Sequence, residues 1–354
     1  MQITRVEVTP LELRLRRPVR MAGSGPVEGV TAIFVRLETR DGRSAWGCTV
    51  ASPELTAEQP GDVLHACREC AALIPDLHPT NIEYSLNMLS SRVPITASTL
   101  CAYDLAFHDL LGQAAGMPLY RLLGGYRSSI PTSVTIPLGT LDDGLEIALD
   151  RASKGFRMLK GKGGLDPAED VRRVRALKTA LPEHTIRLDA DGGYSVRDAL
   201  DVANALKGVL ETFEQPVPAY DLTGLRQVTE MSPVPVLADQ SLRDPSSALE
   251  LAAGRMVDGL SIKLATCGGL RCGQQIDSIA RAARMSTMVS CYVEPALLIS
   301  AGLALALSSP NVRYGDLDGS FDLVDDPSVV GFTVQDGMMT AADVIGLGYS
   351  VNLG

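Results

Sequence analysis

The sequence predicts an α/β barrel preceded by a separate α+β unit, and three observations lead to this fold class. Short apolar runs recur through the second half of the chain at steps of roughly 25 residues, which is the length that one strand, one helix and two loops need. Helical periodicity fills the intervals between these runs. The first third of the chain has a different order, with strand-like patterns first and helical patterns after them.

The N-terminal unit, residues 1–128, is expected to open with a small sheet. Three segments alternate polar and apolar residues as a half-buried strand does: ITRVEVTPLELRL, TAIFVRLET and GRSAWGCTV. The Gly-Arg pair after Asp41 is typical of a hairpin turn. From Glu58 to about Gly125 the periodicity becomes helical, and glycines mark the ends of the helices.

The barrel is expected over residues 129–322, with seven helices between eight strands. The strands are predicted near 132–137, 156–161, 184–189, 210–214, 235–238, 258–263, 286–291 and 312–316. The remaining residues, 323–354, are short, strand-like and rich in glycine. We expect this tail to fold back on the N-terminal unit.

Composition excludes several classes of function. The net charge of −10 argues against a nucleic-acid or anionic membrane surface, and the longest apolar stretch, PALLISAGLALAL, is too short to span a bilayer. The seven cysteines are an odd number, and Met1 leads straight into a strand pattern, so we expect a cytoplasmic protein without disulfides. A small-molecule substrate is the expected partner, and a homo-oligomer is compatible with the sequence.

Three carboxylates follow three consecutive predicted strands: Asp189, Glu214 and Asp239. The carboxyl ends of barrel strands meet at one mouth, where three acids would repel one another unless a cation binds them. Ligands that are all oxygen are typical of Mg²⁺. Alternatively, each acid only caps a helix, but three in consecutive units favour one metal site.

Lysines flank this acidic set on both sides. Lys160 and Lys162 lie on the same face of the second strand because side chains alternate, and Lys263 ends the sixth strand across the barrel. Neighbouring cations and burial are expected to lower a lysine pKa, which suits a general base. Two such bases could act on opposite faces of the α-carbon of a carboxylate, with Lys160 and Mg²⁺ stabilising the enediolate. The alternative is that these lysines point to solvent.

The motifs KGK, LDAD, EQP, ADQS and IKLATCGGL, with AYDLAFHDLLGQAAGMPLYRLLGG before them, resemble those of the enolase superfamily in its muconate-lactonizing subgroup. The resemblance covers nearly the whole chain. It implies a (β/α)₇β modified TIM barrel with an N-terminal α+β capping domain completed by the C-terminal tail. It further implies Mg²⁺ on the three carboxylates, the lysine pair Lys160 and Lys162, and Lys263 as the opposing base.

The chain departs from this family pattern next to the metal ligands. Asp191 stands where the family usually has Asn, and Gln240 where it has Glu, so one change adds a negative charge and the other removes one. We hypothesise that the two changes compensate each other; the alternative is that both side chains point away from the site. The Glu usual in the capping-domain strand is replaced by Cys48.

A further pair of acids indicates the substrate. In RYGDLDGS, Asp316 and Asp318 lie on one face and suit a cationic group such as an α-ammonium, unless they only cap an Asp-Gly turn. This pattern resembles the one with which dipeptide epimerases hold the N-terminus of a dipeptide. Three other residues are candidate substrate contacts: Thr135, Glu294 and Arg20, the last in the first capping-domain loop.

The predicted function is therefore a Mg²⁺-dependent epimerase that inverts the α-carbon of a dipeptide by proton transfer between Lys162 and Lys263. A lyase, cycloisomerase or dehydratase of the same subgroup, or an N-acylamino acid racemase, could use the same site. A non-catalytic binding module would be expected to lack some of the residues that the reaction needs. All five of them are present: Lys162, Asp189, Glu214, Asp239 and Lys263.

Overall fold

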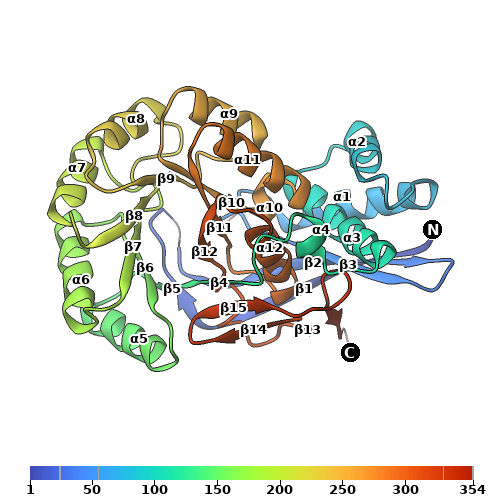
Figure 1. The fold of residues 1–354 in the computed structure, drawn as a ribbon, viewed down its shortest axis with the longest axis horizontal. Coiled ribbons are helices and arrows are strands. Elements are labelled where there is room, and N and C mark those ends of the chain that lie inside the picture. Colours follow the sequence, from blue (N-terminus) through green and yellow to red (C-terminus); the bar gives the residue numbers. More distant parts are fainter. Residues whose placement is uncertain (24, 55, 330, 353–354) are drawn as a thin grey trace.

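The computed structural model describes residues 1–23, 25–54, 56–329 and 331–352, and its larger part is a parallel barrel (Figure 1). Eight strands follow one another round the barrel in sequence order, from β5 to β12. Their bounds are β5 Ser133–Ile136, β6 Met158–Lys162, β7 Thr185–Asp189, β8 Leu210–Glu214, β9 Val236–Ala238, β10 Gly259–Lys263, β11 Ser286–Ser290 and β12 Val312–Asp316. A parallel bridge between Thr132 and Gly315 joins the last strand to the first.

Helices fill every interval between these strands, and α5 to α9 arc round the side of the barrel away from the N-terminal unit (Figure 1). They are α5 Leu141–Ser153, α6 Pro167–Ala180, α7 Val196–Ala205, α8 Leu222–Met231, α9 Pro245–Ala253, α10 Leu264–Cys267, α11 Leu270–Ala282 and α12 Ala296–Ser308. Helices α5 to α9 begin where a side-chain oxygen accepts a backbone N–H of the first turn: Thr140, Asp166, Ser195, Asp221 and Asp244. Helix α12 is buried all along its length and lies between the barrel and the N-terminal unit.

The N-terminal unit has the predicted order of strands and then helices. An antiparallel sheet β1-β2-β3 is followed by the helices, and the elements are β1 Ile3–Val19, β2 Val27–Thr39, β3 Ser44–Ala51, α1 Pro60–Leu73, the 3₁₀ turn η1 Ile74–Asp76, α2 Ile82–Arg92, α3 Ala97–Ala115 and α4 Leu119–Leu122. Helix α3 packs across β3, with Gly47 so close to α3 that a Cβ there would come 1.9 Å from the Ala102 carbonyl oxygen. The predicted fold class, a barrel with an N-terminal α+β unit, is confirmed.

The C-terminal tail contacts both parts of the molecule. Its strands are β13 Ser328–Val329, β14 Phe332–Gln335, β15 Met338–Ala341 and β16 Ser350–Val351, and β15 pairs with β4, Ser129–Pro131, just before the barrel. The Leu347 N–H donates to Asp109 of α3 at 2.8 Å, and the Tyr349 hydroxyl donates to the Trp46 carbonyl of β3 at 2.7 Å. The domain boundaries after residues 128 and 322 stay a prediction.

The seven cysteines are all free, and six of them are buried. Among the described residues, no helix is long and apolar enough to cross a membrane.

Candidate active site

A cavity of about 360 Å³ opens at the carboxyl ends of the barrel strands, beneath the last residues of β1. Its lining includes the two lysines predicted to be bases and both acids of the DLD motif, Asp316 and Asp318. The covering segment is fixed at two points: the Arg16 N–H donates to the Asp322 carbonyl, and the Leu138 N–H donates to the Arg20 carbonyl. The cavity therefore lies between the barrel mouth and the N-terminal unit.

The three predicted metal ligands converge at the bottom of this mouth. Asp189, Glu214 and Asp239 each offer a carboxylate oxygen, these oxygens lie within 4.8 Å of one another, and all three residues are buried. The Glu214 Oε1 atom is buried without a hydrogen-bond partner among the described residues. An orphaned carboxylate oxygen in a buried, all-oxygen set fits a hard divalent cation.

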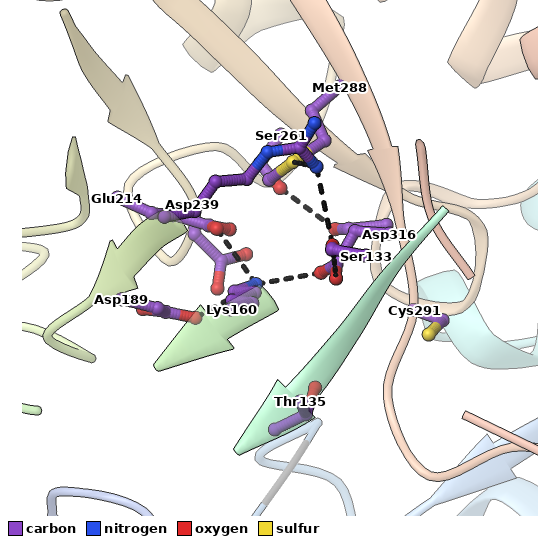
Figure 2. Close-up of polar contacts among 12 residues, drawn as sticks. Ser133, Thr135, Lys160, Asp189, Glu214, Asp239, Ser261, Met288, Cys291 and Asp316 are labelled. Carbon is purple, nitrogen blue, oxygen red and sulfur yellow. Dashed lines mark hydrogen bonds and ion pairs between the residues drawn. The ribbon is translucent and has the colours of Figure 1, made fainter. Parts of the chain in front are cut away.

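Lys160 reaches the same point from β6. Its ammonium lies 3.0 Å from Asp189, 2.8 Å from Glu214 and 2.7 Å from Asp316. Figure 2 shows the lysine between the acidic triad and Asp316. Lys160 thus links two of the three carboxylates to the first acid of the DLD motif.

Lys162 and Lys263 approach the triad from two different strands. The Lys162 ammonium lies 2.8 Å from Asp189, and the Lys263 ammonium contacts Asp239. Both line the cavity, Lys162 from β6 and Lys263 from β10. The predicted pair of lysines facing one cavity is present in the geometry.

The prediction of lowered lysine pKa values is wrong for this arrangement of charges. Burial by itself would lower the pKa of Lys162, but the Asp189 and Asp191 carboxylates outweigh it and raise that pKa. The same balance, with Asp239 as the leading carboxylate, raises the pKa of Lys263. The carboxylates that would bind a cation thus also stabilise the protonated form of the two lysines.

The chain just after Lys162 is held in place by the close packing of Gly164 and by hydrogen bonds to the neighbouring helix α6. Gly164 has a φ of +102°, and a Cβ there would come 2.1 Å from the Ala190 carbonyl oxygen. The Gly164 N–H donates to Asp170 at 2.9 Å, and Arg173 donates to the Lys162 carbonyl at 3.3 Å. The glycines of GKGG, residues 161–164, therefore allow the chain after β6 to approach the chain after β7 closely.

The two acids of the DLD motif have different partners. Asp316 pairs with Lys160 and accepts a hydrogen bond from Ser133 at 2.6 Å, which keeps its pKa low despite burial. Asp318 accepts the Thr135 backbone N–H at 2.7 Å, and burial beside Asp316 raises its pKa to about 6. Figure 2 shows Thr135 and Cys291 apart from the lysine-centred cluster.

The two residues that depart from the family pattern touch each other. Asp191 accepts hydrogen bonds from Lys162 at 2.9 Å and from the Gln240 amide at 3.1 Å, and its side chain is only 7% exposed. Both side chains therefore face the site.

Two predicted substrate contacts lie outside the cavity lining. Glu294 is buried in the loop between β11 and α12, where it accepts a hydrogen bond from the Tyr292 N–H at 3.2 Å. Burial raises its pKa to about 8. The Arg20 side chain is exposed, and Arg16 and Arg17 of the same segment line the cavity instead. Their roles as substrate contacts stay predictions.

Sequence reasoning missed two residues that the geometry brings to the site. Ser133 precedes Thr135 by two positions on the same strand, so alternation could have found it. Tyr292 comes two residues after the end of β11, and its ring centroid lies 4.5 Å from the Lys263 ammonium. A single aromatic residue after a strand gives no comparable signal.

An eight-stranded barrel with acids on three consecutive strands and lysines on both sides defines a metal-dependent α/β-barrel enzyme. Residues 3–124 match the N-terminal domain of the mandelate racemase / muconate lactonizing enzyme family, and residues 145–353 match the enolase C-terminal domain-like family. The chain belongs to this enolase-type family, as its motifs predicted.

Several characterised relatives span almost the whole chain. An L-Lys-D/L-Arg epimerase of Methylococcus capsulatus is 36% identical over 98% of this chain and 99% of its own length. A hydrophobic dipeptide epimerase of Enterococcus faecalis is 31% identical over 100% of this chain and 99% of its own. The crystal structure of a dipeptide epimerase from E. faecalis with Mg and L-Leu-L-Tyr has a TM-score of 0.95 at 31% identity and covers 99% of this chain and 100% of that one. Epimerases are isomerases, and this chain is an enzyme of that class.

Proposed function

We propose that this protein is a Mg²⁺-dependent epimerase that inverts the α-carbon of the C-terminal residue of a dipeptide. The observation that carries the proposal is that Lys162 and Lys263 line one cavity, each against a different carboxylate of the acidic triad. The relatives named above, which act on dipeptides or have been crystallised with one, support the substrate class.

In the proposed reaction one lysine amine takes the α-proton as the C–H bond breaks, and the opposing lysine ammonium then gives a proton to the other face of the enediolate. Mg²⁺ bound by Asp189, Glu214 and Asp239 would neutralise the substrate carboxylate and the acids that raise the lysine pKa values. Lys160 adds a positive charge where the enediolate charge develops. The dipeptide ammonium would lie against Asp316 and Asp318.

The test is α-proton exchange across a dipeptide library, with the Mg²⁺-loaded enzyme in D₂O. The expected result is inversion with one deuterium gained at the α-carbon and no other change of mass. Loss of water, or of another group, would instead identify a lyase or dehydratase.

N-acylated amino acids are the matched comparison, because they lack the ammonium that Asp316 and Asp318 are proposed to bind. The free dipeptide is expected to have the higher kcat/KM. A preference for the N-acylated substrate would favour the racemase alternative, the activity for which a Bacillus cereus relative 25% identical to this chain is named.

A further inference from the structure

The two base lysines share a pattern of contacts that their chemistry does not by itself explain. Each ammonium touches one carboxylate of the acidic triad and one group outside it. For Lys162 the outside group is Asp191, at 2.9 Å. For Lys263 it is the ring of Tyr292, at 4.5 Å from the ring centroid. Each lysine is thus held from two sides, one of them independent of the metal ligands.

The backbone of Tyr292 is fixed close to Lys263. β10 and β11 run in parallel, with Lys263 beside Ser290, two residues before the tyrosine. The Tyr292 N–H donates to the buried Glu294 at 3.2 Å. Gly319 lies so close that a Cβ there would come 1.9 Å from the Tyr292 carbonyl oxygen. The backbone from which the ring extends is therefore held by contacts with Glu294 and Gly319.

The contact is made by the face of the ring and not by the hydroxyl. Within the described part of the chain, the Tyr292 hydroxyl makes no hydrogen bond, and the residue lines the same cavity as both lysines. The negative face of an aromatic ring attracts an ammonium, most strongly when water is largely excluded. Lys263 is 5% exposed, so this attraction acts on a nearly buried charge.

We propose that Tyr292 is a positioning residue for Lys263 and acts on one face of the substrate's α-carbon only. Asp191 is its counterpart for Lys162. The inference rests on the two-base reaction proposed above. A side chain that orients one lysine changes proton transfer on that lysine's face, whereas a general loss of folding or of metal changes both faces alike.

The experiment measures α-proton exchange in D₂O from each epimer of one dipeptide separately, with the Mg²⁺-loaded enzyme. Lys162→Ala and Lys263→Ala are expected to keep exchange from one epimer each, and so identify which lysine serves which epimer. Tyr292→Leu is expected to slow exchange from the epimer served by Lys263 by roughly 3- to 30-fold, the range of cation–π contacts from exposed to desolvated, and to leave the other epimer within about twofold.

Two variants sharpen the result. Tyr292→Phe keeps the ring and is expected to restore the rate lost in Tyr292→Leu. Asp191→Ala is expected to slow exchange from the epimer served by Lys162 more than exchange from the epimer served by Lys263. Equal slowing of both epimers by Tyr292→Leu, or a Phe variant as slow as the Leu variant, would overturn the positioning role. If the two lysine variants show no preference between epimers, the two-base function itself fails, and the inference with it.

Discussion

At the scale of single residues, Asp191 and Gln240 are the most informative pair, because the two side chains that we hypothesise to compensate each other are in direct contact. The Gln240 amide and the Lys162 ammonium both donate to the Asp191 carboxylate. Burial, with the neighbouring Asp189 carboxylate, raises the pKa of Asp191, so this acid is costly to keep charged and depends on these donors.

Asp191→Asn is therefore expected to lower kcat/KM by roughly 10- to 100-fold, because Lys162 loses a charged hydrogen-bond partner. The double variant Asp191→Asn with Gln240→Glu should recover part of this loss, since the negative charge returns on the side chain that contacts position 191. Steady-state kinetics on both single variants and the double variant give the coupling. Losses that simply add would show that the two positions are independent.

At the scale of elements, the N-terminal unit caps a barrel helix. Asp104 of α3 accepts the backbone N–H of Leu270 at 2.5 Å, at the start of α11. Gly269 leaves room for this contact, since a Cβ there would come 2.4 Å from the Asp104 carboxylate. Helix α11 follows the short helix α10 that begins after Lys263, so this contact ties the N-terminal unit to the end of β10 that carries this lysine.

We expect Asp104→Ala to reduce the free energy of unfolding by about 3 kcal/mol, because buried backbone N–H groups lose a charged acceptor. The matched control is Asp166→Ala, which removes an exposed cap within α6 and should cost about 1 kcal/mol. Urea unfolding of both variants measures the difference. Equal losses would mean that the contact between the two parts adds nothing to an ordinary cap.

The contact between α3 and the tail predicts a pH dependence. Burial raises the pKa of Asp109 to about 6, although it accepts hydrogen bonds from Leu347 and Gln113. Since the folded state binds this proton more tightly than the unfolded state, the contribution of Asp109 to stability is greatest below about pH 4. It declines as the pH rises to about 6 and is constant above that.

Asp109→Asn keeps an acceptor for Leu347 and removes the buried charge. At pH 8 the variant should be more stable than the native protein by on the order of 2 kcal/mol, and near pH 4.5 the difference should shrink by more than half. Thermal unfolding at the two pH values measures this. The same difference at both would show that charge is not the cause.

At the scale of the whole molecule, the sequence predicted the barrel closely because a βα unit has a nearly fixed length. The predicted fourth strand, 210–214, coincides with β8, and the carboxylates at successive strand ends converge. The sign of the lysine pKa shifts was predicted wrongly, because it depends on which charges come within 3 Å, and spacing along the chain does not give that. The packing of Tyr292 on Lys263 was missed, because it depends on how the loop after β11 folds over the end of β10.

The acidic triad joins three consecutive strands, so metal binding should stabilise the molecule as a unit. Mg²⁺ at 100 times its Kd should add about 2.7 kcal/mol to the free energy of unfolding and so raise the melting temperature by a few degrees. Removal of Mg²⁺ with EDTA should reverse this rise in melting temperature. Glu214→Gln removes a ligand charge and should reduce this shift by more than half. The control is Glu211→Gln, because Glu211 lies on the same strand and pairs with Arg187. This variant should keep the full Mg²⁺-dependent rise in melting temperature even if it is less stable. Should Glu214→Gln respond to Mg²⁺ as the native protein does, the triad is not the metal site.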